Sequence, residues 1–308
     1  MTTSSQNPQV AIIILNWNGL RILRDCLESL ASIRYPEYTI VVVDNNSDDG
    51  SQEYLTTNYP DLKLICNSSN LGFPAGNNVG IEWAIENGYE YVLLLNYDTS
   101  VEPDFLDKLV DVAQSQPEVG VIGPCIKYFS HPKHIWSLGG YIDSRTHRPF
   151  HLSSKDDSEA HGCGRYIETE WVSGCAMLVR VDLIKKIGLL DSDYFFGSED
   201  ADWCIRARRI DSKVVVVPDA VVYHKTAISR FRGKYTFLHH YYDMRNLLIF
   251  IEKHYSFTGV FWMSVFFSAI KRASWSLVCL DWKSILSLFL AFWDFRKKKY
   301  GKASSVPH

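Results

Sequence analysis

Three carboxylates fall within four positions of the stretch FFGSEDADW, at 195–203. They could form the acidic first turn of a helix with Ser198 as its N-cap, because the helix dipole stabilises acidic side chains there. Alternatively, one of them could remove a proton from a reacting group as a general base. The stretch alone leaves both interpretations open for Glu199, Asp200 and Asp202.

A second cluster, Asn96-Tyr97-Asp98, follows the most apolar predicted strand. Carboxylate and carbonyl oxygens suit Mg²⁺ or Mn²⁺, and an ion that bridges a diphosphate needs only one or two protein carboxylates. Asn and Asp are also common in the turns that end strands. His224 follows another apolar run, at 221–223, and is either a structural histidine or a metal ligand.

Two polar loops indicate where a nucleotide could bind. In DNNSDDGS, Asp44 can contact a base or a ribose, whereas Ser47 or Asp48 can cap the following helix. In NLGFPAGNNVG, the start of a helix offers free backbone N–H groups to a phosphate, although Asn77 and Asn78 can equally be caps. The loops do not follow the EF-hand, dinucleotide or P-loop patterns, and the chain has no nucleophile elbow and no H-E-x-x-H.

Short apolar runs alternate with segments of helical periodicity as far as residue 122. This alternation predicts a parallel, doubly wound α/β sheet, in which ligands bind beyond the carboxyl ends of the strands. Amides or carboxylates follow four of the predicted strands, a pattern that core packing does not explain. The expected strands are 10–15, 38–43, 62–65, 91–95 and 119–122, and the expected helices are 19–31, 51–59, 76–87 and 105–114.

The second half begins with a polar, turn-rich excursion at 127–170, which we expect to pass over the site with weak strands. Helices are expected at 181–187 and from FFGSEDADW to Ile210, and the chain reads as helical from Tyr235. The remaining expected strands are 168–171, 176–179, 214–217 and 221–223. The predicted organisation is a nucleotide-binding domain at 1–250 and a helical segment at 251–308.

Composition indicates a folded cytosolic protein. The chain has 308 residues, of which 46% are apolar and 22% charged. Seven scattered cysteines without a C-x-x-C pair predict reduced thiols, and the polar start MTTSSQNPQ does not resemble a secretion signal. Nine Lys and Arg against two Asp give 253–308 a charge of +7, so the rest of the chain carries −10.

The apolar runs of this basic tail are too short to span a bilayer, which takes about 20 residues. Its tryptophans and basic clusters suit helices that lie in a membrane interface, so we expect peripheral contact through 257–299 on the inner face of the cell membrane. A helical subdomain or a dimer interface is the alternative. Nucleic acid is not an expected partner, and an oligomer is possible.

Taken together and in this order, the motifs resemble the inverting glycosyltransferase family 2 with the GT-A fold, most of all its rhamnosyltransferase-like and galactofuranosyltransferase-like members. The resemblance extends over about residues 10–250. It rests on VAIIILNWNG, VVVDNNSDDGS, NLGFPAGNNVGI, LLLNYDTSVEPDFL, WVSGCAMLVRVDLIKKIGLLD, FFGSEDADWCIRAR and the segment around His224.

The resemblance implies roles for individual residues. Asp200 would be the catalytic base that deprotonates an acceptor hydroxyl as it attacks C1 of the donor sugar, oriented by Glu199. Asp98 matches the last carboxylate of the family's metal-binding D-x-D element, and His224 would join it. The implied nucleotide-sugar contacts are Asn16, Asn18, Asp44, Asn46, Asn70, Gly72, Asn77, Asn96, Tyr97 and Asp98, and the implied acceptor-side contacts are Trp171, Gly174 and Phe196.

The implied activity is transfer of a sugar from a nucleotide-diphosphate donor, with dTDP-rhamnose as the first candidate. The acceptor would be a hydroxyl of a glycan or of a lipid-linked saccharide in cell-surface polysaccharide synthesis. Mg²⁺ or Mn²⁺ would stabilise the leaving diphosphate. A UDP-hexose or UDP-galactofuranose donor is one alternative. Another is a non-catalytic protein that binds nucleotide sugars or glycans, since Asn96 replaces the first acid of the metal element.

Overall fold

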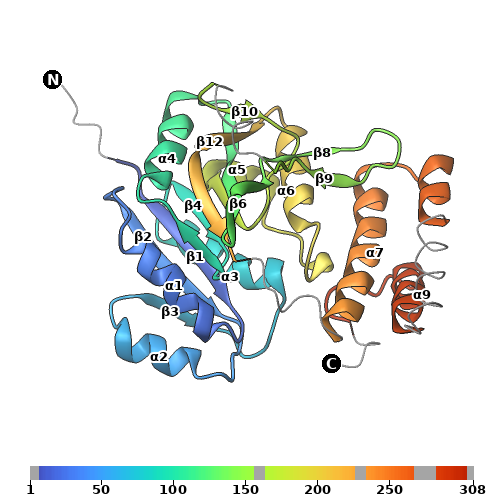
Figure 1. Cartoon of the computed structure of the whole chain (residues 1–308), viewed down its shortest axis with the longest axis horizontal. Helices are drawn as coiled ribbons and strands as arrows, with labels where there is room; N and C mark the ends of the chain where they lie inside the picture. Colours follow the sequence, from blue (N-terminus) through green and yellow to red (C-terminus); the bar gives the residue numbers. More distant parts are fainter. Residues whose placement is uncertain (1–6, 156–163, 226–233, 267–281, 304–308) are drawn as a thin grey trace.

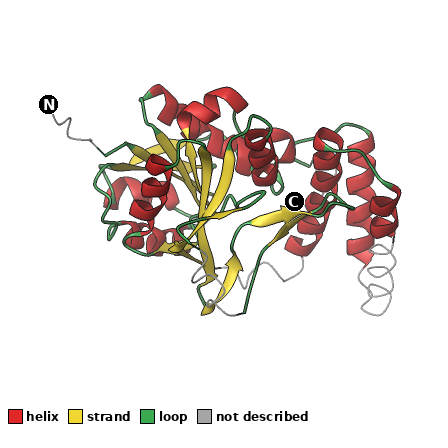
Figure 2. Cartoon of the chain, turned by 90° about the horizontal axis from the view of Figure 1, so that it is seen from above, coloured by secondary structure: helices red, strands yellow, loops and turns green. Residues whose placement is uncertain are grey.

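A twisted sheet with helices on both faces forms the body of the computed structural model, and two long C-terminal helices pack beside it (Figure 1). The structure describes residues 7–155, 164–225, 234–266 and 282–303. Seen from above, helices cover the sheet on both sides (Figure 2). The main strand order is β10-β12-β6-β11-β4-β1-β2-β3, with β5 beside β12 and β7 beside β6.

The sheet is mostly parallel, which confirms the predicted α/β class. β1 runs parallel to β2 and β4, β2 to β3, and β6 to β12, whereas β11 runs antiparallel between β4 and β6. The strands are β1 (Val10–Asn16), β2 (Tyr38–Asp44), β3 (Lys63–Cys66), β4 (Tyr91–Leu95), β5 (Thr99–Val101), β6 (Val119–Tyr128), β7 (His131–Ser137), β8 (Gly140–Ile142), β9 (Pro149–His151), β10 (Ile167–Glu168), β11 (Ala176–Arg180) and β12 (Lys213–His224).

Alternate residues of the strands supply two apolar cores, one on each face of the sheet. Ile12 and Ile14 of β1 face the core that α1 and α4 cover, and Ile13 faces the core with α3 and α6. Burial on both faces explains why β1 reads as a continuous apolar run. The helices are α1 (Leu20–Leu30), α2 (Ser51–Asn58), α3 (Phe73–Glu86), α4 (Phe105–Ser115), α5 (Val181–Ile187), α6 (Glu199–Arg208), α7 (Lys234–His254) and α9 (Trp282–Arg296).

Several predicted boundaries differ from the structure. The helix expected at 76–87 begins at Phe73, because Pro74 fits a first helical turn, where no N–H is needed. The two strands expected at 214–217 and 221–223 form the single strand β12, whose register against β6 shifts between Val217 and Val221. The excursion contains β7 to β10, and the small hairpin β8–β9 lies outside the main sheet.

The C-terminal helices pack against each other and against the body. Tyr241 of α7 donates its hydroxyl to Asp294 of α9 at 2.8 Å, and both side chains are buried. Leu248 and Phe250 of α7 belong to the main core, so the boundary proposed after residue 250 falls within one helix. Within the described ranges, we find no helix that combines the length and the apolar character needed to cross a membrane.

Candidate active site

Asp98 and His224 come from different strands, and strand pairing brings them together. Asp98 precedes β5, and His224 ends β12. These strands pair antiparallel with His224 opposite Thr99, and Lys225 donates its N–H to the Asp98 carbonyl at 2.8 Å. As a result, Nε2 of His224 lies 3.2 Å from Oδ1 of Asp98.

This pair fits a hard divalent cation. Both side chains are buried, and neither ring nitrogen of His224 makes a hydrogen bond of good geometry. A buried polar atom without a partner costs free energy, and an ion beside Asp98 would satisfy it. In the described part of the chain, no group of three or more His, Cys, Asp and Glu side chains could hold a metal. The pair therefore fits an ion whose other ligands come from a diphosphate and water.

The acidic dyad lies at the start of α6, as the helix interpretation requires. Glu199 is buried and Asp200 is half-buried. Ser198 occupies the N-cap position, but its backbone is left-handed (φ 77°) and its hydroxyl does not cap the helix, contrary to the prediction. Asp202 contacts Arg206 at 2.8 Å and His254 at 2.6 Å, so its role is packing between α6 and α7.

The two carboxyls of the dyad have different environments. Burial raises the pKa of Asp200, while N–H groups of Gly174 and Ala201 and the nearby His151 oppose the shift. Gly174 donates to Asp200 Oδ2 at 3.0 Å, whereas Oε2 of Glu199 is buried without a partner. Burial and the charge of Asp200 raise the pKa of Glu199 to about 8. Burial therefore favours the protonated form of Glu199, while the N–H groups of Gly174 and Ala201 favour the carboxylate of Asp200.

A short backbone segment links the dyad to the loop after β4. Gly174 binds the Asp200 carboxylate, and the next residue, Cys175, accepts a hydrogen bond from Asn96 N–H at 2.9 Å. Tyr97 lies over the loop after β1, where a side chain at Gly19 would meet its ring at 2.6 Å. The loops after β1 and β4, and the segment before β11, thus meet at one edge of the sheet.

Asp44 is fully buried, and its oxygens already have partners within the protein. Oδ2 accepts from Asn16 at 2.8 Å, and Oδ1 accepts from the Ser47 N–H at 2.9 Å and from Gln52 at 2.6 Å. As placed, Asp44 orders its loop, and its recognition of a nucleobase stays a prediction. Oδ1 of Asn16 is a buried acceptor without a partner, which leaves one polar atom for a ligand.

The loop after β2 also differs from the predicted capping pattern. Helix α2 starts at Ser51 after Gly50, so neither Ser47 nor Asp48 caps it. Ser47 instead accepts from the backbone N–H of Asn18 at 2.9 Å, which ties the loops after β1 and β2 together. Asn46 is exposed in a left-handed conformation (φ 66°).

The loop before α3 is organised by a residue that sequence reasoning missed. Asn45 donates to the side chain of Asn70 and to the Gly72 carbonyl, both at 3.1 Å, and accepts from Leu71 N–H at 3.2 Å. The sequence could have indicated this residue, because Asn45 stands between Asp44 and Asn46, which were both predicted to contact the nucleotide sugar. Asn77 lies inside α3 and bonds to the Phe73 carbonyl, and Asn78 bonds to Leu190, so neither is a cap.

A row of aromatic rings leads from His224, which lies beside Asp98, to Trp171, which was predicted to contact the acceptor. Trp136 contacts His224 (4.8 Å between centroids) and His151 (4.6 Å), and His151 contacts Trp171 (4.5 Å). Trp171 was predicted from the resemblance, but Trp136 and His151 were missed. They lie in the turn-rich excursion, where no periodicity or motif marks them.

His151 lies within electrostatic reach of both halves of the site. Desolvation lowers its pKa, the charge of Asp200 opposes this shift and His224 adds to it. Ser137 uses its hydroxyl proton on the Gly139 carbonyl (3.2 Å), so its oxygen accepts from Nδ1 of His151 at 2.9 Å. This arrangement leaves the lone pair on Nε2 of His151.

Of the other predicted acceptor-side residues, Gly174 contacts Asp200. Gly174 approaches both Asp200 and Phe73, because an added Cβ would lie 3.5 Å and 3.3 Å from them. Phe196, in the turn before α6, exposes 39% of its surface.

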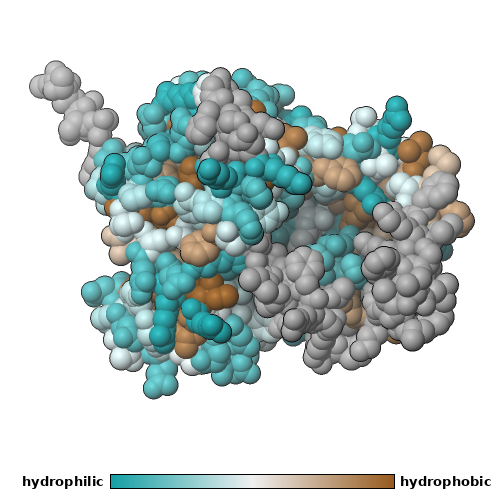
Figure 3. Space-filling model, viewed as in Figure 1, coloured by the Kyte–Doolittle hydropathy of each residue, from teal (hydrophilic) through white to brown (hydrophobic). Residues whose placement is uncertain are grey.

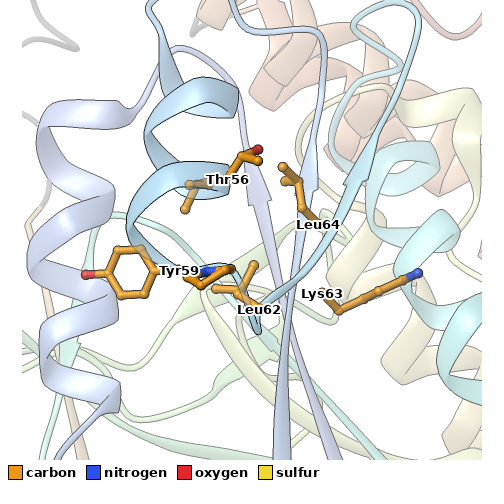
Figure 4. Close-up of a pocket in the computed structure, with 7 residues that line it drawn as sticks. Thr56, Tyr59, Leu62, Lys63 and Leu64 are labelled. Atoms are coloured by element: carbon orange, nitrogen blue, oxygen red, sulfur yellow. The ribbon is translucent and has the colours of Figure 1, made fainter.

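A shallow cavity elsewhere has no part in this arrangement. It measures about 320 Å³ and lies between α2 and the amino end of β3, beside Tyr59, Leu62 and Lys63 (Figure 4). The predicted site residues lie instead near the carboxyl ends of the strands, where ligands bind in open α/β sheets.

Comparison with known proteins places this chain in a family. The sequence model of the glycosyltransferase-like family 2 matches residues 8–235. N-acetylglucosaminyl-diphospho-decaprenol L-rhamnosyltransferase of Mycobacterium tuberculosis is 28% identical over 223 residues, which is 66% of this chain and 71% of that protein. The dTDP-rhamnosyl transferase RfbF of Shigella flexneri is 20% identical over 81% of this chain and 82% of its own length.

Solved structures share the fold. The mannosyltransferase PcManGT from Pyrobaculum calidifontis, in complex with GDP-Man and Mn²⁺, has a TM-score of 0.57 and 18% identity over 95% of this chain and 76% of that chain. A fragment of TarS from S. aureus has a TM-score of 0.53 at 18% identity, over 79% of this chain and 65% of the fragment. With its GT-A fold, this chain is a glycosyltransferase that belongs to the glycosyltransferase-like family 2.

Proposed function

We propose that the chain inverts the anomeric centre of a donor sugar while transferring it, with Asp200 as the base. The observation that carries this proposal is the asymmetry of the dyad. Asp200 has N–H partners that favour its ionised form, and Glu199 has none on its buried Oε2. Asp200 is therefore the carboxylate available to take the proton of the attacking hydroxyl.

In this proposal the donor diphosphate lies beside Asp98 and His224, which would hold Mg²⁺ or Mn²⁺. Bound there, the ion would neutralise negative charge on the leaving diphosphate. The supporting observation is the buried imidazole of His224, which has no good hydrogen bond and lies 3.2 Å from Asp98. The neighbour PcManGT was solved with GDP-Man and Mn²⁺.

The proposed donor is dTDP-rhamnose, because two relatives are rhamnosyltransferases by name, one of them a dTDP-rhamnosyl transferase. A UDP-hexose or UDP-galactofuranose is the alternative donor. The proposed acceptor is a hydroxyl of a glycan or of a lipid-linked saccharide in cell-surface polysaccharide synthesis. The name of the mycobacterial relative, which includes a decaprenol diphosphate, supports a lipid-linked acceptor.

Peripheral contact with the inner face of the cell membrane is part of the proposal. Large apolar side chains are exposed on the helical stretch 259–266 and on α9. Apolar surface shows at the upper right of Figure 3, where the stretch 259–266 lies. The predicted region 257–299 also includes 267–281, which lie outside the described residues. The exposed side chains are Val260, Trp262, Met263, Phe266, Leu286, Phe289, Phe292 and Trp293.

Replacing the base tests the proposed chemistry. Asp200→Asn should lower kcat by about 10²–10⁴-fold, the usual contribution of a general base. The affinity for the nucleotide, measured by calorimetry with Mn²⁺, should change little. A panel of dTDP and UDP sugars identifies the donor in the same assay. Unchanged turnover of Asp200→Asn would remove Asp200 as the base, and a wild-type chain that binds the nucleotide but transfers no sugar would favour the non-catalytic alternative.

A further inference from the structure

Helix α7 supports the turn that delivers the dyad. Asn246 is fully buried, and its side-chain amide lies 2.8 Å from each of three backbone carbonyls, those of Tyr194, Phe196 and Gly197. All three belong to the turn immediately before Glu199. One amide from outside the turn therefore holds its whole length.

Arg245, the neighbouring residue, holds the same turn at its first residue, Tyr194. Its guanidinium is fully buried and donates to the Tyr194 carbonyl at 2.9 Å and to the Gly301 carbonyl at 2.7 Å. It also contacts the amide oxygen of Asn246 at 3.0 Å, which fixes the orientation of that amide. Arg245 thereby links the turn, α7 and the segment that follows α9.

The turn needs external support because its backbone is unfavourable. Phe195 has φ 61° and ψ −45°, and Ser198 has φ 77°. Conformations of this kind cost about 1–3 kcal/mol each in residues other than glycine, and they persist only where the surroundings impose them. The hydroxyl of Ser198 does not compensate, since it makes no capping hydrogen bond.

The same turn contacts the loop before α3. The Phe195 carbonyl accepts from Phe73 N–H at 2.7 Å, and a Cβ on Gly72 would lie 2.5 Å from that carbonyl. A displacement of the turn would therefore move both the base, which follows it, and the loop expected to contact the donor.

We infer that Asn246, supported by Arg245, is a positioning residue that sets Asp200 against the donor by holding the strained turn 194–198. The inference rests on the proposed role of Asp200 as the base. It makes α7, most of which lies beyond the family match that ends at residue 235, a structural component of the active site.

The test compares Asn246→Ala with Tyr241→Phe. The control variant also removes a buried hydrogen bond of α7, the one to Asp294. Tyr241 has no hydrogen bond to the turn, and phenylalanine keeps the ring on which the Arg245 guanidinium lies. Asn246→Ala should lower kcat about tenfold to a hundredfold, because small displacements of reacting groups have effects of that size. Its affinity for dTDP or UDP with Mn²⁺ should fall much less. Tyr241→Phe should keep kcat within about twofold at a comparable loss of thermal stability.

Amide hydrogen exchange supplies a readout that does not depend on turnover. Exchange across 194–200 should accelerate in Asn246→Ala and stay unchanged in Tyr241→Phe. If Asn246→Ala does not fold, Asn246→Ser keeps a polar group that is too short to reach three carbonyls and should give the same pattern. Equal kcat in the Asn246 and Tyr241 variants would overturn the inference. Nucleotide binding without transfer by the wild-type chain would instead count against the proposed function.

Discussion

At the scale of single residues, the two carboxyl groups of the dyad have different neighbours, which favour the protonated form of Glu199 and the carboxylate of Asp200. Asp200 Oδ2 receives the Gly174 N–H, whereas Oε2 of Glu199 is buried without a donor and burial outweighs the backbone N–H groups of Gly197 and Glu199. Glu199→Gln imitates the protonated side chain, so it should retain most of kcat at pH 7, while Asp200→Asn should lose about 10²–10⁴-fold. Steady-state transfer assays decide this, and equal losses in both variants would contradict the division of roles.

Glu199 also makes stability depend on pH. Its folded pKa of about 8 lies above the ordinary value of 4.5, so the folded state binds the proton more tightly than the unfolded state does. The free energy of unfolding should therefore fall as pH rises from about 4.5 to about 8. Glu199→Gln should remove that decline, as urea unfolding at pH 6 and pH 9 will show. A decline of the same size in Glu199→Gln would assign the pH dependence to another group.

His224 tests the proposed metal site. His224→Asn should weaken the affinity for Mn²⁺ in the presence of dTDP or UDP by about 10–100-fold, a loss typical of disturbed metal sites. Calorimetric titration measures it. His131→Ala is the matched control, because His131 is an exposed histidine on β7. Equal Mn²⁺ affinity in the wild type and in His224→Asn would exclude His224 as a ligand.

At the scale of elements, the loop before α3 depends on a glycine. Gly72 has φ 85° and lies against Phe195, where a Cβ would be 2.5 Å from the carbonyl oxygen. Backbone strain alone would cost about 1–3 kcal/mol in Gly72→Ala. The variant should lower the free energy of unfolding by more than this amount and should also weaken nucleotide binding.

Gly88→Ala separates strain from contact. Gly88 has φ 80°, but a Cβ there would meet no atom within 4 Å. Gly88→Ala should therefore lower the free energy of unfolding through backbone strain alone and leave the nucleotide affinity unchanged. Chemical unfolding and calorimetry measure the two effects, and equal losses in both variants would show that the contact with Phe195 contributes nothing.

At the scale of the whole molecule, α7 contacts the turn 194–198 and packs on α9. It therefore connects the body of the protein to the exposed apolar side chains of α9. Phe289 and Trp293 expose 62% and 50% of their surfaces. If this surface lies in a membrane interface, Phe289→Ser with Trp293→Ser should reduce sedimentation with anionic vesicles. Ile210→Ser, at another exposed apolar side chain, should not reduce it.

The same variants test the alternative, in which the exposed side chains of α9 contact a second copy of the chain. Equal sedimentation of the double variant and of Ile210→Ser would argue against membrane contact through α9. Dissociation of a dimer by the double variant, measured by size-exclusion chromatography with light scattering, would instead identify the surface as a contact between two copies of the chain.

Local patterning was sufficient to predict the alternating strands and helices of the first half and the edge of the sheet at which polar residues gather. Buried parallel strands are continuous apolar runs, and their polar carboxyl ends stand out from them. The proposed pairing of Asp98 with His224 could be inferred only from resemblance, since 126 positions separate them in the sequence. Strand pairing between β5 and β12 gives the physical reason for their proximity.

The tertiary structure alone decided what holds these groups. His151 and Asn246 carry no motif, and their partners include rings and backbone carbonyls distant in the sequence. Asn45 lies within a motif, but its contacts with Asn70 and Gly72 follow only from the folded loop. The sequence determined which carboxylates are present and that a helix begins near them. Their protonation depends on burial and on N–H groups from other segments, because desolvation and hydrogen bonding are properties of the packed chain. The folded surroundings therefore determine that burial favours the protonated form of Glu199 and that N–H groups favour the carboxylate of Asp200.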